Sequence, residues 1–369
     1  MDTESISQPV ISVPAVVNWF RVVCFVGLAF GLTWLVDLAI YLKGGLANPS
    51  TQLLLQFQML LPAFSALLLE TFFFQDSPLF YRSNRGAARW FVYFYFLLTT
   101  LYLIGAIVSL LQPAMATTLT AALLIPNVLG LLLLLVLRFK GGKQTFVEAG
   151  MAGGKVRIWF GYGLGLVAFF AFQSWLNYVF NLGTMVDLQT VFPQAATNAM
   201  PTNLLLLSLV LNTVIIGPFL GLIITFGEEY GWRGFLQREL TKLGRIRGVF
   251  LLGVIWGIWH WPVIWMGYNY PGEPVLGSLL MVGYCIILAY FLAYAVFKSK
   301  GIWTAAYLHA LNNQTLSFLM LAVVAPTSTL YSFGMGLPAL LLGALVVLLL
   351  LRDPIWKETQ SLEEQMVLP

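Results

Sequence analysis

The sequence predicts an all-α polytopic membrane protein, a bundle of about ten transmembrane helices with both termini in the cytoplasm. Three observations lead to this fold class. Hydrophobic residues make up 59% of the chain and charged residues only 9%, whereas about 25% of a soluble domain is charged. The apolar residues form long continuous runs, and the basic residues gather in alternate connections between these runs.

Each run is long enough to cross a bilayer, whose hydrocarbon core needs about 20 residues of helix. The runs are too continuous for barrel strands, which alternate over about ten residues. Met1 to Pro14 lacks the basic start of a signal peptide, so we expect the first run to stay in the membrane. The ten expected spans are 17–42, 52–74, 90–111, 118–138, 158–182, 204–227, 248–266, 276–297, 302–323 and 334–351.

The basic residues predict the orientation of this bundle. Among the odd-numbered connections, only the first contains a basic residue, Lys43. Basic residues concentrate on the cytoplasmic side of membrane proteins, so we expect both termini and every even connection there. The net charge of +4 therefore marks topology and does not indicate nucleic-acid binding. The basic residues of the even connections and the tail are Arg82, Arg85, Arg89, Arg138, Lys140, Lys143, Lys155, Arg157, Arg233, Arg238, Lys242, Arg245, Arg247, Lys298, Lys300, Arg352 and Lys357.

Outside the spans, no segment is long enough for a soluble domain. The connection 183–203 has the composition of a short interfacial helix on the outer face. Cys24 and Cys285 both fall in apolar segments, which favours packing roles over a disulfide or a thiolate metal site.

Several polar groups lie inside the expected spans of the C-terminal half. An ionisable side chain in hydrocarbon costs roughly 2.5–3.5 kcal/mol on insertion scales, so such groups usually serve a site. At a rise of 1.5 Å per residue, we expect Glu228 about 15 Å, His260 about 18 Å and His309 about 12 Å from the cytoplasmic surface. Asn313 follows at about 18 Å. Three helices thus bring polar groups to a similar depth, which we expect to be accessible from the cytoplasmic side.

The local spacing of these residues suggests their roles. Glu229 and Arg233 stand four residues apart with the acid first, the favoured order for a helical ion pair. Glu228 then points about 100° away and is left for chemistry. His309 and Asn313 share a helix face, although Asn312 is an alternative amide.

Three further expectations concern the surroundings of the site. Trp256 lies one turn before His260, and we expect its side chain to form part of the wall of the site. The sixth helix should continue past Glu229, with a kink at Gly217-Pro218. Two other acids, Asp37 and Glu70, lie near helix ends, where we expect them to snorkel toward water.

This set of groups is typical of a hydrolase. A buried carboxylate with two imidazoles can hold a divalent metal or can activate water as a general base. A neutral Asn amide can stabilise an oxyanion. Two alternatives use the same residues: a proton-coupled transporter, and a non-catalytic membrane scaffold or immunity protein.

Three motifs in order carry a family resemblance. E-E-Y-G-W-R at 228–233 resembles the EExxxR motif, W-G-I-W-H at 256–260 resembles FxxxH with Trp256 in place of Phe, and His309 to Asn313 resembles HxxxN. These are the motifs of the CPBP family of intramembrane metalloproteases. That family includes the CAAX prenyl proteases of the Rce1-like type and bacterial abortive infection proteins.

The resemblance implies an intramembrane endopeptidase of the glutamate or metallo type that cleaves a peptide bond near the cytoplasmic membrane face. Glu228 would activate water beside His260, and Glu229 with Arg233 would form a supporting ion pair. His309 and Asn313 would stabilise the oxyanion. Alternatively, His309 would join Glu228 and His260 around a divalent metal such as zinc.

The resemblance also implies partners and a domain organisation. The substrate would be a membrane-associated protein or peptide, with lipidated chains as one class, and the protein would sit in the cell membrane as a multi-pass protein. The lack of a targeting sequence favours a prokaryotic plasma membrane. We expect transmembrane helices of unassigned role at 1–203, a CPBP-like catalytic helical core at 204–323, and a last helix with a cytoplasmic tail at 324–369.

Overall fold

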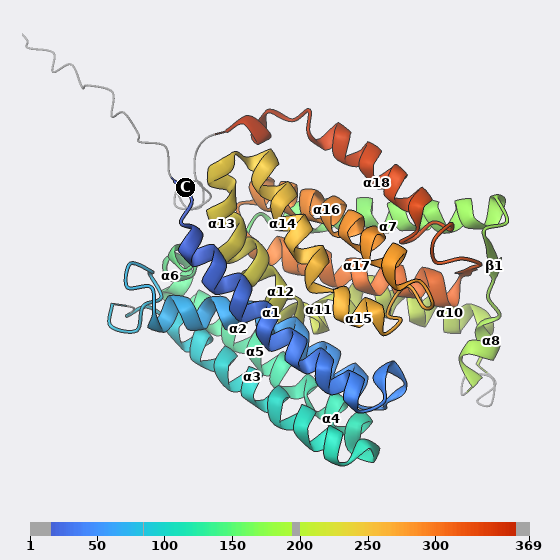
Figure 1. Cartoon of the computed structure of the whole chain (residues 1–369), viewed down its shortest axis with the longest axis horizontal. Coiled ribbons are helices and arrows are strands. Elements are labelled where there is room, and N and C mark those ends of the chain that lie inside the picture. Colours follow the sequence, from blue (N-terminus) through green and yellow to red (C-terminus); the bar gives the residue numbers. More distant parts are fainter. Residues whose placement is uncertain (1–15, 84, 194–199, 359–369) are drawn as a thin grey trace, which may run out of the picture.

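The computed structural model describes residues 16–83, 85–193 and 200–358, and these residues are overwhelmingly helical (Figure 1). All ten expected spans are helical, and seven helical segments are long and apolar enough to cross a membrane. The helices are α1 (Trp19–Leu42), α2 (Thr51–Phe72), α3 (Ala88–Leu111), α4 (Ala116–Ala122), α5 (Leu124–Leu137), α6 (Lys143–Glu148), α7 (Val156–Val179), α8 (Leu188–Val191), α10 (Thr202–Leu211), α11 (Gly217–Leu220), α12 (Leu222–Glu229), α13 (Gln237–Leu240), α14 (Arg245–Trp259), α15 (Trp261–Trp265), α16 (Pro274–Ser299), α17 (Ile302–Ala322) and α18 (Leu337–Leu350).

The helices form two groups that meet at α12. Helices α1, α2, α3 and α5 pack in sequence, whereas α14, α16, α17, α18 and α7 form the second group (Figure 1). Helix α12 contacts α2 on one side and α17 on the other. The segment that carries the paired glutamates therefore lies in the centre of the molecule.

The sixth span is a broken helix. Two π-helical stretches, Asn212–Ile216 and Tyr230–Leu236, interrupt it, and the chain remains helical through Glu229 to Leu240, as the sequence predicts. The irregularity spreads over these wide turns and a turn at Gly221, in addition to Gly217-Pro218. Wide turns of this kind occur frequently at functional sites.

The seventh span ends early for a local reason. Helix α14 stops at Trp259 because Pro262 follows, and the short helix α15 begins with that proline in its first turn. His260 is the residue between the two helices. The break therefore places the imidazole at a helix end in the interior of the bundle.

Both ends of the described chain contact the region where α13 is followed by α14, one through Glu239 of α13 and the other through Arg245 of α14. The Asn18 amide donates to Glu239 Oε2 at 3.1 Å, and Arg245 Nη1 donates to the Ile355 carbonyl at 2.6 Å. The two ends thus lie at one end of the bundle, which agrees with an even number of spans.

The 183–203 connection holds the four-residue helix α8, in line with the short helix that its composition indicates, and residues 194–199 of it lie outside the described part. The strand β1 (Gly183–Met185) in the same connection was not expected, and it pairs antiparallel with β2 (Val324–Pro326). The expected cytoplasmic tail is described only as far as residue 358.

The snorkelling interpretation of Asp37 and Glu70 is wrong. Both side chains are buried, with 3% and 5% of their surface exposed. Gln58 Nε2 donates to Asp37 Oδ1 at 2.5 Å, and Glu70 accepts from Tyr230 Oη at 2.6 Å and from Arg238 Nη2 at 2.8 Å. Each acid is hydrogen-bonded to residues that lie far away in the sequence. Such long-range partners cannot be recognised from the sequence alone.

Candidate active site

Two glycines allow the helix that carries Glu228 to lie directly against α2. A Cβ atom at Gly227 would come within 2.3 Å of the Met59 carbonyl oxygen, and one at Gly231 within 2.5 Å of Pro62 Cβ. Small residues four apart permit this close approach of helices in membranes. This close contact fixes the position of Glu228, the residue after Gly227, relative to α2.

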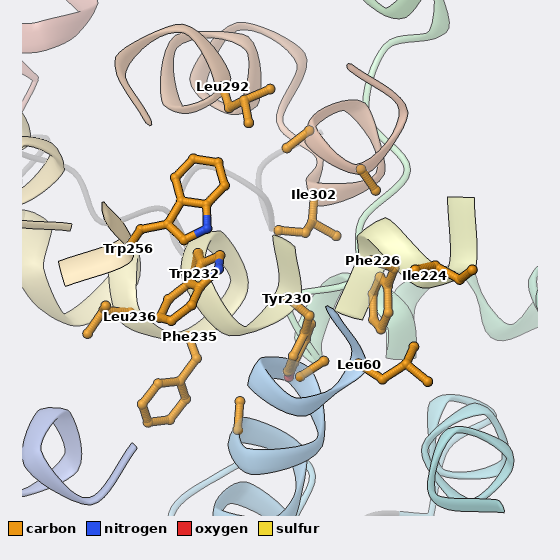
Figure 2. Packing of buried hydrophobic residues seen from close by; sticks show 14 of the residues in the cluster. Leu60, Ile224, Phe226, Tyr230, Trp232, Phe235, Leu236, Trp256, Leu292 and Ile302 are labelled. Carbon is orange, nitrogen blue, oxygen red and sulfur yellow. The ribbon is translucent and has the colours of Figure 1, made fainter. Parts of the chain in front are cut away.

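The Glu228 carboxylate is held by two indole groups. Trp256 Nε1 donates to Glu228 Oε2 at 2.8 Å, and Trp232 Nε1 donates to the same oxygen at 3.4 Å. Both tryptophans belong to the buried aromatic cluster seen in Figure 2. Within the described part of the protein, Glu228 Oε1 accepts no hydrogen bond, so this oxygen is free to take part in a reaction.

Glu229 forms the ion pair that the spacing predicts. Arg233 Nη1 donates to Glu229 Oε1 at 2.9 Å, and neither side chain is exposed to solvent. The same carboxylate oxygen lies 2.7 Å from His309 Nδ1, a contact that the sequence does not reveal. Glu229 therefore joins the motif helix to α17, and the Arg233 guanidinium also stacks over the Trp256 ring at 4.3 Å.

His260 is oriented by a backbone carbonyl. Its Nδ1 lies 2.9 Å from the Trp256 carbonyl oxygen. A carbonyl can only accept, so the ring proton belongs on Nδ1 and the neutral imidazole presents Nε2 as an acceptor. The Trp256 ring lies between the two histidines, 6.0 Å from His260 and 5.5 Å from His309 between ring centroids.

A small amide network completes the site on α17. Asn312 Nδ2 donates to Asn313 Oδ1 at 3.1 Å, and Asn312 Oδ1 accepts from Tyr284 Oη at 2.9 Å. The Asn313 carbonyl is thereby engaged, and its amino group remains as a donor. This arrangement favours Asn313 over Asn312 as the amide that faces a substrate.

The predicted catalytic residues line one cavity of about 400 Å³. Its wall includes Glu228, His260, His309 and Asn313, together with Trp256. Glu229 and Arg233 are not part of the wall, and their contacts place them behind His309 and Trp256. The structure thus separates four residues that reach the cavity from a pair that supports them.

The residues do not form a three-ligand metal site. Within the described ranges, no group of three or more His, Cys, Asp and Glu side chains is arranged to hold a metal ion. The expected set of Glu228, His260 and His309 shares a cavity, but it does not meet that geometry. We therefore derive no reaction step through a metal.

Sequence reasoning missed several residues that shape the site. Trp232 stands four residues after Glu228, a spacing that could have indicated its hydrogen bond. The pairs Gly227/Gly231 and Gly253/Gly257 follow the small-xxx-small pattern, and the second pair brings α14 against α16. Tyr284 carries no such signal, because its contact with Asn312 depends on how α16 and α17 pack.

Comparison with known proteins gives one match. Residues 205–315 match the family model described as type II CAAX prenyl endopeptidase Rce1-like. The matched segment covers less than a third of the chain and contains all three motifs. No curated protein and no solved structure matches the chain. The match supports a multi-pass membrane protein whose family is one of proteases.

Proposed function

Because residues 205–315 are Rce1-like and support assignment to the CPBP/CAAX protease family, we propose that this protein is an intramembrane endopeptidase in which Glu228 activates water. One observation carries the proposal: Glu228, His260, His309 and Asn313, from three separate helical segments, line the same cavity. A site for peptide hydrolysis needs a base, a water position and an oxyanion donor within reach of one carbonyl.

In the proposed reaction, Glu228 Oε1 removes a proton from a water molecule held by Nε2 of His260. The water oxygen forms a bond to the carbonyl carbon of the scissile peptide, and the carbonyl electron pair moves onto its oxygen. When the carbonyl reforms, the C–N bond breaks. Glu228 then returns the proton to the departing nitrogen, which leaves as an amine.

The oxyanion would be stabilised by His309 and Asn313. Nδ1 of His309 contacts Glu229, so Nε2 is the atom available to the cavity. With both glutamates ionised, the buried group of Glu228, Glu229, Arg233 and His309 is neutral only when His309 carries a proton. In that state Nε2–H donates, and it acts with the Asn313 amino group on the developing negative charge.

For cleavage near the cytoplasmic membrane face, as the resemblance implies, the peptide bond must reach Glu228, at an expected depth of about 15 Å in a hydrocarbon core about 30 Å thick. A divalent metal such as zinc is tested by metal analysis of the purified protein and by chelation. Stoichiometric metal, with activity lost on chelation and restored on its return, would assign water activation to the metal.

The proposal is tested by comparing the termini of membrane proteins in cells that express wild type or Glu228→Gln. New termini that require Glu228 are expected, and they would identify the substrate, which we expect to be a membrane-associated protein. His260→Ala should abolish the same termini. Equal sets of termini at equal protein abundance would contradict the proposal, as would proton-dependent flux in liposomes that is lost in Glu228→Gln.

A further inference from the structure

The cavity at the site is closed toward the end of the bundle where the basic connections lie. The backbone of 151–155 runs against the start of α17: Gly153 bridges to Gly301, and the Lys155 amide donates to the Ser299 carbonyl at 3.0 Å. A Cβ at Gly301 would lie 2.1 Å from the Gly154 nitrogen, so the two backbones are in direct contact. No opening remains between them.

Aromatic side chains fill the space beneath this backbone contact. Trp303 Nε1 donates to the Met151 carbonyl at 3.1 Å, and the Trp303 ring stacks on Phe226 at 4.5 Å between centroids. Tyr230 donates to the Ala149 carbonyl at 3.1 Å. These side chains are buried, and Phe226 and Tyr230 appear side by side in Figure 2. These side chains occupy the space at this end, and none of them lines the cavity that holds Glu228.

The cavity extends in the opposite direction. Its wall includes residues of the connections that follow α15 and precede α18, such as Asn269 and Met335, and residues of the first turns of α2, such as Gln52. None of the described residues of 75–89, 139–157, 238–247 and 298–301 takes part in it. The lining residues thus point to a mouth at the ends of the odd connections. These connections have only Lys43 as a basic residue, and the charge rule places them outside the cytoplasm.

The mouth is lined with carboxamides that have no partner. Within the described residues, the side chains of Gln52, Gln56, Asn269 and Gln314 line the cavity and make no hydrogen bond to the protein. No Lys or Arg of the described chain lines it. A carboxamide offers both a donor and an acceptor, the same pair that each peptide unit of an extended chain needs. A prenyl chain would leave these amides buried and unsatisfied, which is costly.

We propose that the substrate enters from the face of the odd connections as an extended, unlipidated polypeptide segment, and that these carboxamides bind its backbone. This inference rests on the proposed function for its chemistry, while the route into the cavity is a property of the fold. It differs from the cytoplasmic access expected from depth alone, because the packing around Trp303 closes that side.

The route is tested by thiol labelling in a cysteine-free, inactive background, Cys24→Ala, Cys285→Ala and Glu228→Gln. Gln56→Cys is treated with membrane-impermeant sulfonatoethyl methanethiosulfonate in right-side-out and inverted vesicles. Tyr331→Cys, on an odd connection, and Arg85→Cys, on an even one, report the two faces. Gln56→Cys should label from the same face as Tyr331→Cys. Labelling only from the Arg85→Cys face, or from neither, overturns the route, and Gln52→Cys serves if Gln56→Cys does not fold.

The class of occupant is tested with the same labelled position. An acetylated and amidated alanine–glycine decapeptide should slow the labelling of Gln56→Cys, and S-farnesylcysteine methyl ester should leave it unchanged. Protection by the farnesyl compound alone would overturn the assignment of an unlipidated peptide. Neither measurement depends on catalysis, so failure of the inference and failure of the proposed protease activity are separate results.

Discussion

Trp256 contacts three of the charged or titratable groups of the candidate site. Its indole N–H donates to Glu228, its ring lies under the Arg233 guanidinium, and its backbone carbonyl orients His260. The family motif has Phe at this position, which cannot donate. The chain therefore holds its proposed base with a hydrogen bond that a phenyl ring does not provide.

Trp256→Phe should lower kcat by about tenfold to a hundredfold, because a hydrogen bond to a charged group contributes roughly 1.5–3 kcal/mol. KM should change less than kcat, since Phe keeps an aromatic face for Arg233 and removes only the N–H donor and part of the ring. The kinetic constants are measured on the substrate identified from its termini. Trp356→Phe is the matched control, because its buried N–H donates to the Leu350 carbonyl far from the site. An unchanged kcat would contradict the proposal that Trp256 positions Glu228.

We expect Glu229, which is paired with Arg233 and contacts His309, to stabilise the site without reacting with the substrate. Glu229→Gln should reduce the free energy of unfolding by about 3–5 kcal/mol, because it leaves the Arg233 charge buried without its partner. Thermal unfolding in detergent measures the loss. Lys242→Met removes the more exposed member of an ion pair at the molecular surface and should cost about 1 kcal/mol or less. Equal stability of Glu229→Gln and wild type would mean that the ion pair contributes nothing measurable.

At the scale of elements, close helix contacts set the position of the site. The Gly227/Gly231 pair brings the motif helix onto α2, and the Gly253/Gly257 pair brings α14, which ends beside His260, onto α16. A Cβ at Gly257 would lie 2.5 Å from Val282 Cα. The distance between Glu228 and the imidazoles therefore depends on helix contacts at glycines, where there is no room for a side chain.

Gly227→Ala should destabilise the protein by about 1–3 kcal/mol and should abolish cleavage, because the new methyl group pushes α12 away from α2. Thermal unfolding and the appearance of Glu228-dependent termini are the two measurements. Gly161→Ala, on α7, is the control, since nothing lies within 4 Å of its added Cβ. Wild-type activity in Gly227→Ala would show that this helix contact does not set the site.

At the scale of the whole molecule, the two ends of the described chain contact neighbouring parts of α13 and α14, and no residue of 238–247 lines the cavity. The charge pattern predicts that this shared end is cytoplasmic. Tags fused before Met1 and after Pro369 should therefore resist protease added outside intact cells, and both should be digested in inverted vesicles. Digestion of either tag from outside would reverse the orientation, and with it the face from which we expect the substrate.

Much of the architecture could be read from the chain alone. Long apolar runs predict the helical bundle, because a bilayer leaves an isolated span no other way to satisfy its backbone; the count of ten spans stays a prediction. The i,i+4 spacing predicts the Glu229–Arg233 pair, because both residues belong to one helix with known geometry. The three motifs locate the family region, which the match at 205–315 confirms.

By itself, then, the sequence determined the helical membrane fold, the residues of the candidate site and the ion pair within one helix, since these follow from local spacing and hydropathy. Only the tertiary structure decided the partners that come from elsewhere in the chain. Trp256 donating to Glu228, His309 meeting Glu229, and the buried state of Asp37 and Glu70 are such contacts. The open side of the cavity belongs with them, because the direction of an opening depends on how helices pack against one another.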